Sequence, residues 1–390
     1  LVAAVAGTLG AATLVVGALG MIAAPWLVLL FAPGFGEGAE PRHILAAEML
    51  RITFPYIIFI SLTSLAGGVL NTWGRFAVPA FTPVLLNICM IAAALWLAPR
   101  FETPIVALAW GVAVAGVVQL LFQLPFLARL GMLVWPRLVR GHAGVRRVLG
   151  LMLPALFGVS VAQINMLINT LVASFLVTGS VSWLYYSDRL LEFPLGLLGV
   201  ALGTVILPSL ARDHARQSAE AFSSTLDWAL RCSFVVALPA TVGLAMLAVP
   251  LLGTLFAYGE FGAEDVTMAA RSLLAFAPGL LPLVLVKVLA PGYYARQDTR
   301  TPVRVGVMAM VADIVLLAVL VWPLAHAGLA LATALAAALN AALLYRGLYR
   351  DRVHRPRPGW PAMFARTLFA CGVMAVLLHA MRGDVTFWST

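Results

Sequence analysis

Three ionisable side chains, Asp188, Arg189 and Glu192, stand close together inside an apolar stretch of this sequence. The surrounding run, roughly 181–208, is long enough to cross a membrane. Charged groups are expensive in contact with lipid, so their presence predicts a protein interior or a water-filled cavity. Arg189 could bind an anion through its planar fork of donors. It could equally form a structural ion pair with Glu192, three residues further along a helix.

A second polar group lies in the preceding apolar run, 148–177, where Asn165 and Asn169 fall on one side of a helix. They could line a cavity, although amide side chains also join helices without touching a substrate. Asp313 lies deep in the run 302–323. A lone carboxylate at that depth must be protonated, paired or holding a cation.

Two further basic residues, Arg51 and Lys287, are predicted near the ends of the runs 48–70 and 267–290. Long basic side chains at such places extend toward the lipid headgroups. Simple anchoring explains both, and a role as a gate or as a contact with a lipid headgroup is the alternative.

The composition places these residues in an integral membrane protein. Of 390 residues, 62% are apolar and 11% are charged, and the mean hydropathy is +0.99, whereas soluble domains carry about 25% charged residues. The net charge of +9 comes mostly from loops, where basic residues set topology, so it does not indicate nucleic-acid binding. The sequence contains no nucleotide loop, nucleophile motif or metal-ligand spacing, and its six histidines lie at loops or span ends, which argues against a membrane-embedded transferase.

The predicted fold is an all-α polytopic membrane protein with eleven transmembrane helices. Basic residues concentrate in one set of alternate loops, which places residue 1 on the cytoplasmic side. The polar stretch 209–225 is expected to form a short surface helix. The eleven predicted spans are 3–31, 48–70, 77–98, 105–128, 148–177, 181–208, 226–249, 267–290, 302–323, 326–346 and 362–381.

An internal repeat runs through the chain. Residues 24–34 match 249–259, and Pro55 and Pro79 recur as Pro278 and Pro302, 223 residues later. Matches in the same order with nearly constant spacing indicate a duplicated unit. The second copy has two spans, within 148–225, that have no counterpart ahead of residue 1. We therefore expect that two N-terminal helices are missing.

Five ordered blocks of the sequence resemble the MurJ/MviN family of lipid II flippases, in the multidrug/oligosaccharidyl-lipid/polysaccharide exporter superfamily. One of them contains Ser187-Asp-Arg-Leu-Leu-Glu-Phe-Pro194, and the resemblance covers essentially the whole chain. The family has fourteen helices, of which the eleven predicted here would be the third to the thirteenth. The five blocks are Arg51–Ile57, Gly68–Phe81, Ser180–Pro194, Leu198–Leu210 and Lys287–Pro302.

The resemblance implies two pseudo-symmetric helical lobes around a central cavity. Residues 1–147 would form an incomplete N-terminal lobe, 148–350 the C-terminal lobe, and 351–390 a cytoplasmic basic loop with one additional helix. It also implies a transporter of the bacterial inner membrane, not an enzyme, that moves lipid II outward by alternating access. A related polysaccharide-lipid or drug exporter is the alternative. The oligomeric state is left open.

The resemblance also assigns roles to residues. Arg189 matches a cavity arginine, and Asp188 and Glu192 match its acidic neighbours. One cation with two anions would by itself repel a pyrophosphate, so further cations are expected around the substrate. Some relatives bind sodium among the corresponding helices, which makes Asp313 with Thr333 a candidate site. No cofactor is expected, and coupling to sodium, protons or the membrane potential remains open.

Overall fold

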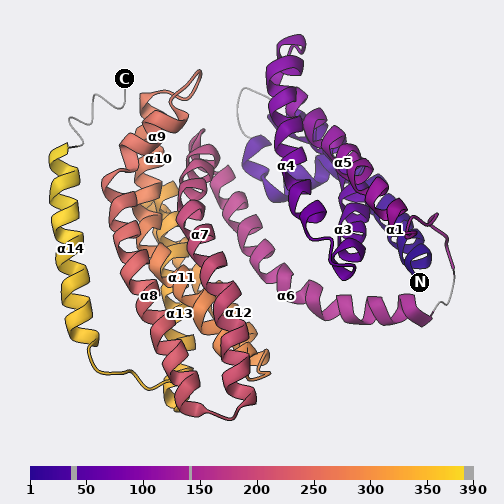
Figure 1. The fold of residues 1–390 in the computed structure, drawn as a ribbon. Helices are drawn as coiled ribbons and strands as arrows, with labels where there is room; N and C mark the ends of the chain where they lie inside the picture. Colours follow the sequence, from indigo (N-terminus) through magenta and orange to yellow (C-terminus); the bar gives the residue numbers. More distant parts are fainter. Residues whose placement is uncertain (37–41, 140–142, 382–390) are drawn as a thin grey trace. The chain divides into compact units, whose positions relative to one another are not determined.

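The computed structural model describes residues 1–36, 42–139 and 143–381, apart from the side chains at 151, 153–162 and 200–204. Every regular element in these ranges is helical (Figure 1). The α-helices are α1 (Val2–Phe31), α2 (Arg42–Thr53), α3 (Tyr56–Thr72), α4 (Ala77–Ala92), α5 (Pro104–Arg129), α6 (Ala143–Ser174), α7 (Ser180–Ala215), α8 (Ala219–Met246), α9 (Ala248–Phe256), α10 (Ala263–Phe276), α11 (Leu280–Tyr294), α12 (Arg300–Leu324), α13 (His326–Arg350) and α14 (Trp360–Met381). Short 3-10 or π segments are η1 (Pro33–Gly36), η2 (Ala93–Leu97), η3 (Ala98–Arg100) and η4 (Ala277–Gly279).

Nine helical segments within the described ranges are long and apolar enough to cross a membrane. They are α1, α2 with α3, α4 with η2 and η3, α5, α8, α10 with α11, α12, α13 and α14. The predicted all-α membrane fold is therefore confirmed. The two other predicted spans fall on α6 and α7, whose side chains are only partly described, so the total of eleven stays a prediction.

The prediction of a separate surface helix at 209–225 is wrong. α7 continues to Ala215 and α8 begins at Ala219. Ser218 caps α8, because its hydroxyl oxygen accepts a hydrogen bond from the backbone N–H of Ala221 at 3.3 Å. The polar stretch thus extends two long helices instead of forming a third.

The internal repeat has a structural counterpart in two broken spans. α2 gives way to α3 at Phe54 and Pro55, and α10 gives way to α11 at η4, which contains Pro278. Proline lacks the N–H that a continuing helix requires, which explains why both breaks fall at the repeated prolines. The packing repeats as well: α3 contacts α1 and α5, and α4 contacts α5, just as α11 contacts α8 and α13, and α12 contacts α13.

The chain divides into two compact units, Leu1–Val159 and Ser160–Thr390, with the division inside α6. Small residues fill the helix contacts of the second unit. A Cβ added at Gly279 would lie only 2.9 Å from the Cα of Ala334, so these two backbones approach closely. Close approach through small residues is how membrane helices gain packing energy without a hydrophobic driving force.

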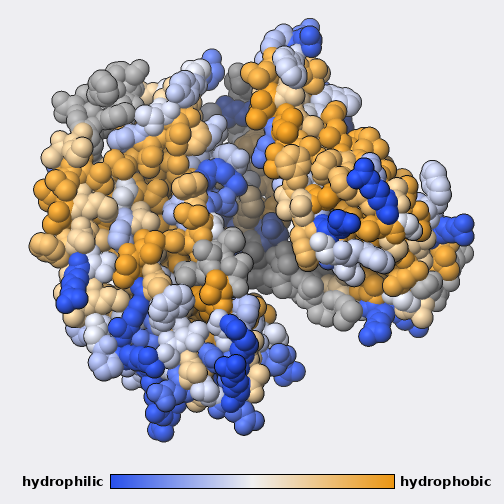
Figure 2. Space-filling view, in the orientation of Figure 1, coloured by the Kyte–Doolittle hydropathy of each residue, from blue (hydrophilic) through white to orange (hydrophobic). Residues whose placement is uncertain are grey.

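Large apolar side chains cover the outside of the helices instead. Trp322 is 87% exposed and Phe369 is 75% exposed, as suits side chains that face lipid. In the second unit, the face shown in Figure 2 is largely hydrophobic, and its hydrophilic residues gather at the end that holds the α7–α8 turn. α14 lies at the edge of this unit and packs against α8 (Figure 1).

Candidate functional site

The charged motif predicted from the sequence lies in the third and fourth turns of α7. The guanidinium Nη1 of Arg189 lies 2.7 Å from Oε2 of Glu192, and the two side chains are 45% and 50% exposed. The Arg189 guanidinium also lies over the ring of Tyr185, 4.9 Å from its centroid. Glu192 and Tyr185 therefore orient Arg189 while leaving about half of its side chain open.

The opposite side of α7 holds the helix in place. The indole N–H of Trp183 donates to Oδ1 of Asp265 on α10 at 2.7 Å. The buried hydroxyl of Ser187 lies 2.7 Å from the carbonyl oxygen of Ala269, also on α10. Because buried polar contacts fix this side of the helix, Asp188 and Arg189 must point elsewhere.

They point into a cavity of about 370 Å³ within the second unit. Of the residues predicted from the sequence, Asn165, Asn169, Asp188 and Arg189 all line it. Thr333 of α13 lines it too. The structure thus brings together two polar groups that are separate in the sequence, and Glu192 joins them through its ion pair with Arg189.

Asp313 lies behind this cavity and is the most unusual group of the site. It is 1% exposed, and neither carboxylate oxygen receives a hydrogen bond from the described residues. Asn165 and Thr333 lie beside it without completing a hydrogen bond. The amide of Asn169 donates to Oγ1 of Thr333 at 3.5 Å, and the side-chain carbonyl oxygens of Asn165 and Asn169 have no partner in the described part of the chain.

This arrangement suits a hard cation. Buried carboxylate and amide oxygens without donors are the ligands that such ions prefer. No group of three or more His, Cys, Asp or Glu side chains that could hold a metal occurs in the described part of the chain. The candidate site therefore combines one acid with neutral oxygens, which fits a monovalent ion better than a transition metal.

The helices extend beyond the predicted spans that contain Arg51 and Lys287, and the places of these two residues relative to the membrane surface stay predictions. Arg51 lies nine residues inside the segment Arg42–Thr72, just before its break. Lys287 lies inside α11, seven residues before the helix ends at Tyr294. Both helices extend further than hydropathy alone indicates.

The aliphatic chain of Lys287 crosses α7 at a glycine. A Cβ added at Gly199 would clash with Cδ of Lys287. Gly199 follows Glu192 by seven residues, which is two turns, so it lies on the same side of α7 about 10 Å further along. Lys287 therefore adds a positive charge to the side of α7 that carries the motif.

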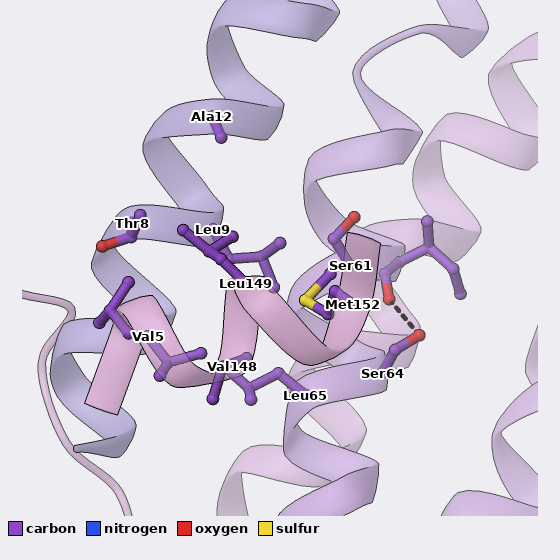
Figure 3. Close-up of a pocket in the computed structure, with 12 residues that line it drawn as sticks. Val5, Thr8, Leu9, Ala12, Ser61, Ser64, Leu65, Val148, Leu149 and Met152 are labelled. Atoms are coloured by element: carbon purple, nitrogen blue, oxygen red, sulfur yellow. Dashed lines mark hydrogen bonds between the residues drawn. The ribbon is translucent and has the colours of Figure 1, made fainter. Parts of the chain in front are cut away.

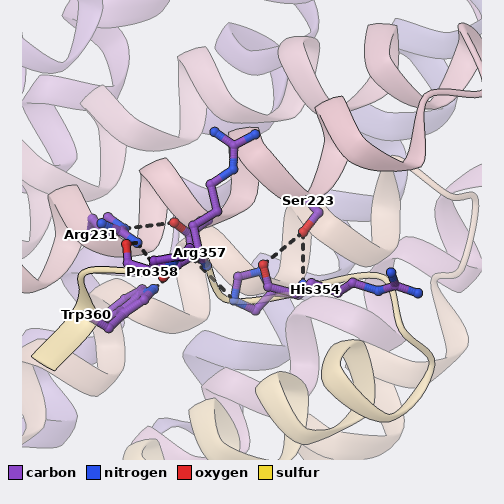
Figure 4. A network of polar contacts seen from close by, with 8 residues as sticks. Ser223, Arg231, His354, Arg357, Pro358 and Trp360 are labelled. Carbon is purple, nitrogen blue, oxygen red and sulfur yellow. Dashed lines mark hydrogen bonds and ion pairs between the residues drawn. The ribbon is translucent and has the colours of Figure 1, made fainter.

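Sequence analysis missed a second charged cluster, around Asp227 on α8 (Figure 4). Asp227 is 2% exposed. Its Oδ2 lies 2.8 Å from Nε of Arg231, and its Oδ1 accepts from the indole N–H of Trp360 at 2.8 Å. The backbone N–H of Arg357 also donates to Oδ1, at 3.3 Å. The signal was present in the sequence, since Asp227 and Arg231 are four residues apart within a predicted span.

The first unit contains a cavity of about 410 Å³ between α1, α3 and α6 (Figure 3). Its lining is mostly apolar, and two of its three hydroxyls, those of Thr8 and Ser64, are used within their own helices. Thr8 donates to the carbonyl of Ala4 at 2.9 Å, and Ser64 donates to that of Ile60 at 2.8 Å. None of its lining residues is charged, so this cavity is not the candidate site.

Comparisons with known proteins agree with this architecture. A family model described as lipid II flippase MurJ matches residues 1–389. A probable lipid II flippase MurJ of Vibrio cholerae is 50% identical over 100% of this chain and 75% of its own length. The lipid II flippase MurJ of Burkholderia cenocepacia is 46% identical over 97% of this chain and 74% of its own length.

Solved structures support the fold. A lipid II flippase MurJ in an inward closed conformation has a TM-score of 0.84 at 23% identity, covering 99% of this chain and 79% of that one. An inward-facing multidrug resistance transporter of the MATE family has a TM-score of 0.74 at 16% identity, covering 89% and 80%.

The family match begins at residue 1, so it gives no support to the predicted absence of two N-terminal helices, which stays a prediction. The prediction of a transporter rather than an enzyme is confirmed, as is the family that the sequence resembles. This multi-pass membrane protein belongs to the lipid II flippase MurJ family.

Proposed function

We propose that this protein moves lipid II from the cytoplasmic to the outer leaflet of the bacterial inner membrane. Residue 1 would lie on the cytoplasmic side, and two lobes would alternate around a central cavity. The observation that carries the proposal is the half-exposed Arg189 guanidinium, held by Glu192 and Tyr185 at the wall of a polar cavity. A planar fork of donors with a free side suits the oxygens of a pyrophosphate.

The charge balance of the site supports the same substrate. Asp188, Arg189 and Glu192 together carry one negative charge, which disfavours a pyrophosphate. Lys287 restores the balance from the same side of α7, because its side chain lies across Gly199. Arg51 of the first unit, which is exposed beside the break in its span, is the further cation that we assign to the headgroup path or a gate.

We further propose that the transport cycle uses a cation, with sodium as the first candidate. Asp313, Asn165, Asn169 and Thr333 would hold it, since four oxygens of this cluster have no hydrogen-bond donor among the described side chains. Asn165, Asn169 and Thr333 also line the cavity that contains Arg189. Occupancy by a cation would thus alter the wall against which the headgroup binds.

The decisive test of function is replacement in a cell. This chain is expressed in a bacterium depleted of its own lipid II flippase, and lipid II is measured in each leaflet of the inner membrane. Restored growth with restored outward lipid II supports the proposal. Drug efflux without lipid II transport would instead identify an exporter of the wider superfamily.

Sodium is tested separately on the purified protein. Sodium chloride is expected to raise the unfolding temperature more than potassium chloride does, and Asp313→Asn is expected to abolish the difference. The Asn variant keeps the size of the side chain and removes its charge. A sodium effect that survives in Asp313→Asn, or none in the wild-type protein, would reject this cation site and leave protons or the membrane potential as the driving force.

A further inference from the structure

The linker that joins α13 to α14, residues 351–359, forms one wall of an open polar cavity of about 740 Å³. α7 contributes Ser209 to the opposite wall. The remaining lining residues come from the first turns of α8 and from the linker itself: Ser224, Thr225, Asp227, Trp228, Arg231, Arg357 and Pro358. The cavity lies well outside the site around Arg189, at the end of the unit that holds the α7–α8 turn.

Two hydrogen-bond donors in this cavity have no partner among the described residues. The guanidinium of Arg357 makes no hydrogen bond or ion pair with any residue that the structure describes, and Figure 4 shows its side chain extending away from the contacts around Trp360. The hydroxyl of Ser224, partly buried, likewise has no partner among the described residues. A guanidinium and a hydroxyl that converge on one space are typical ligands of phosphate oxygens.

The acid in the cavity does not oppose an anion. Asp227 is buried, and its two oxygens already accept from Arg231, Trp360 and the Arg357 backbone. Nε of Arg231 donates to Asp227, and Nη2 donates to the carbonyl oxygens of Arg357 and Pro358, at 2.8 and 3.0 Å. Arg231 neutralises Asp227, so the guanidinium of Arg357 gives the cavity a net positive charge.

The position of the cavity along α7 and α8 indicates which kind of phosphate it can reach. Ser209 lies six residues before the end of α7, and Trp228 lies nine residues after the start of α8. At 1.5 Å per residue, the cavity is roughly 9–14 Å from the α7–α8 turn. Trp228 is 53% exposed, and exposed indoles gather at the level of the headgroups. The cavity therefore opens where lipid phosphates lie.

We propose that this cavity binds the phosphate of an anionic phospholipid, with Arg357 and Ser224 as the donors. Basic pockets between membrane helices take headgroups of this kind. The bound lipid would hold the linker against α8 and so secure α14, which packs on the same helix. This inference is independent of the proposed transport of lipid II.

The test is a lipid titration followed by native mass spectrometry of the purified full chain. Phosphatidylglycerol is expected to bind the wild-type protein at one preferred site, and Arg357→Gln to weaken that site about fivefold, as loss of one arginine near a membrane surface predicts. Ser224→Ala is expected to weaken it by a smaller factor. Arg355→Gln is the matched control, because Arg355 is exposed in the same linker but does not line the cavity.

Three outcomes would overturn the proposal. Equal weakening by Arg357→Gln and Arg355→Gln would mean diffuse attraction to the linker. Equal binding of phosphatidylcholine would remove the preference for an anionic headgroup. Displacement of the lipid by millimolar inorganic phosphate would identify a site for a soluble anion. Unfolding temperatures of the variants, measured without added lipid, confirm that each one is folded.

Discussion

Two charged clusters lie within membrane helices of this protein, and they differ in almost every physical respect. The Arg189–Glu192 pair on α7 is about half exposed and faces a cavity. Asp227 on α8 is 2% exposed and has three donors: Arg231, Trp360 and the backbone of Arg357. The first cluster keeps unused hydrogen-bonding capacity, whereas both oxygens of the buried Asp227 carboxylate accept hydrogen bonds within the second.

The difference in exposure and hydrogen bonding distinguishes a functional cluster from a structural one better than the presence of charge does. A charge inside a membrane segment suggests a functional site by default, and both clusters meet that description. The hydrogen bonds that Asp227 accepts join α8 to the linker and to α14. The second cluster therefore stabilises the fold. The Arg189 side chain is about half exposed, as the proposed binding of the headgroup requires. Substitutions in the first cluster should therefore lower transport, and substitutions in the second should lower stability.

Arg189→Ala should have the largest effect on transport. Loss of a charge-assisted pair of hydrogen bonds to a pyrophosphate is expected to lower lipid II transport by roughly 10- to 100-fold, enough to abolish growth in the replacement assay. Its unfolding temperature should remain near that of the wild-type protein. Arg212→Ala is the control, since Arg212 is exposed near the end of the same helix and its contacts stay within that helix. Normal growth with Arg189→Ala would make the pair with Glu192 structural.

Asp227→Ala should show the reverse behaviour. Removing one partner of a buried pair costs about 3–5 kcal/mol, and Arg231, at 27% side-chain exposure, places the expected loss near the lower limit. Glu192→Ala, which breaks the exposed pair, should cost about 1 kcal/mol or less. The measurement is the free energy of unfolding in detergent. Equal losses for the two variants would erase the distinction between the clusters.

Gly199→Leu should reduce transport by displacing Lys287, whose Cδ occupies the space that a side chain at this position would need. Overpacking costs about 1–3 kcal/mol, and a shifted ammonium is expected to lower transport by roughly tenfold. Gly196→Leu is the control on the same helix, because open space surrounds that glycine. Comparable transport by the two variants would exclude a role for the position of Lys287.

The smallest expected effect is a pH dependence from His354 in the linker. Burial lowers the pKa of its imidazole, although the nearby carboxylate of Asp227, 3.9 Å away, opposes this shift. Below the ordinary histidine pKa of about 6.5 the unfolded chain takes up a proton that the folded protein resists, so stability should fall as the pH drops below that value. The slope is at most about 1.4 kcal/mol per pH unit.

His354→Leu should flatten this part of the stability curve, measured by thermal unfolding between pH 7.5 and pH 5. Transport at neutral pH should be unchanged, because His354 lies in the linker and does not line the cavity of Arg189. A curve for His354→Leu as steep as that of the wild-type protein would assign the pH dependence to another group.

The helices and the α7 motif could be predicted because their signals are local. Hydropathy locates spans, and a three-residue spacing pairs Arg189 with Glu192. Helix ends were less predictable, since apolar runs do not show where a helix stops, and the helices that hold Arg51 and Lys287 extend beyond the predicted spans. The oxygen cluster depends on packing between helices far apart in the sequence: Asn169 and Thr333 are separated by 164 residues. Only the family resemblance suggested Asp313 with Thr333. No local pattern joins Asp227 to Trp360, 133 residues away.

The two broken spans have a consequence for how this chain has diverged. Pro55 and Pro278 mark equivalent points of a duplicated unit, and the position equivalent to Asp313, 223 residues earlier, is Met90. The first copy instead joins its polar groups to one another, as where the hydroxyl of Tyr56 donates to Oε1 of Gln119 at 3.1 Å. The two copies thus differ at this position: one has an apolar side chain and the other a buried acid with no hydrogen-bond partner among the described residues. Substitution at Met90 should be tolerated where substitution at Asp313 is not.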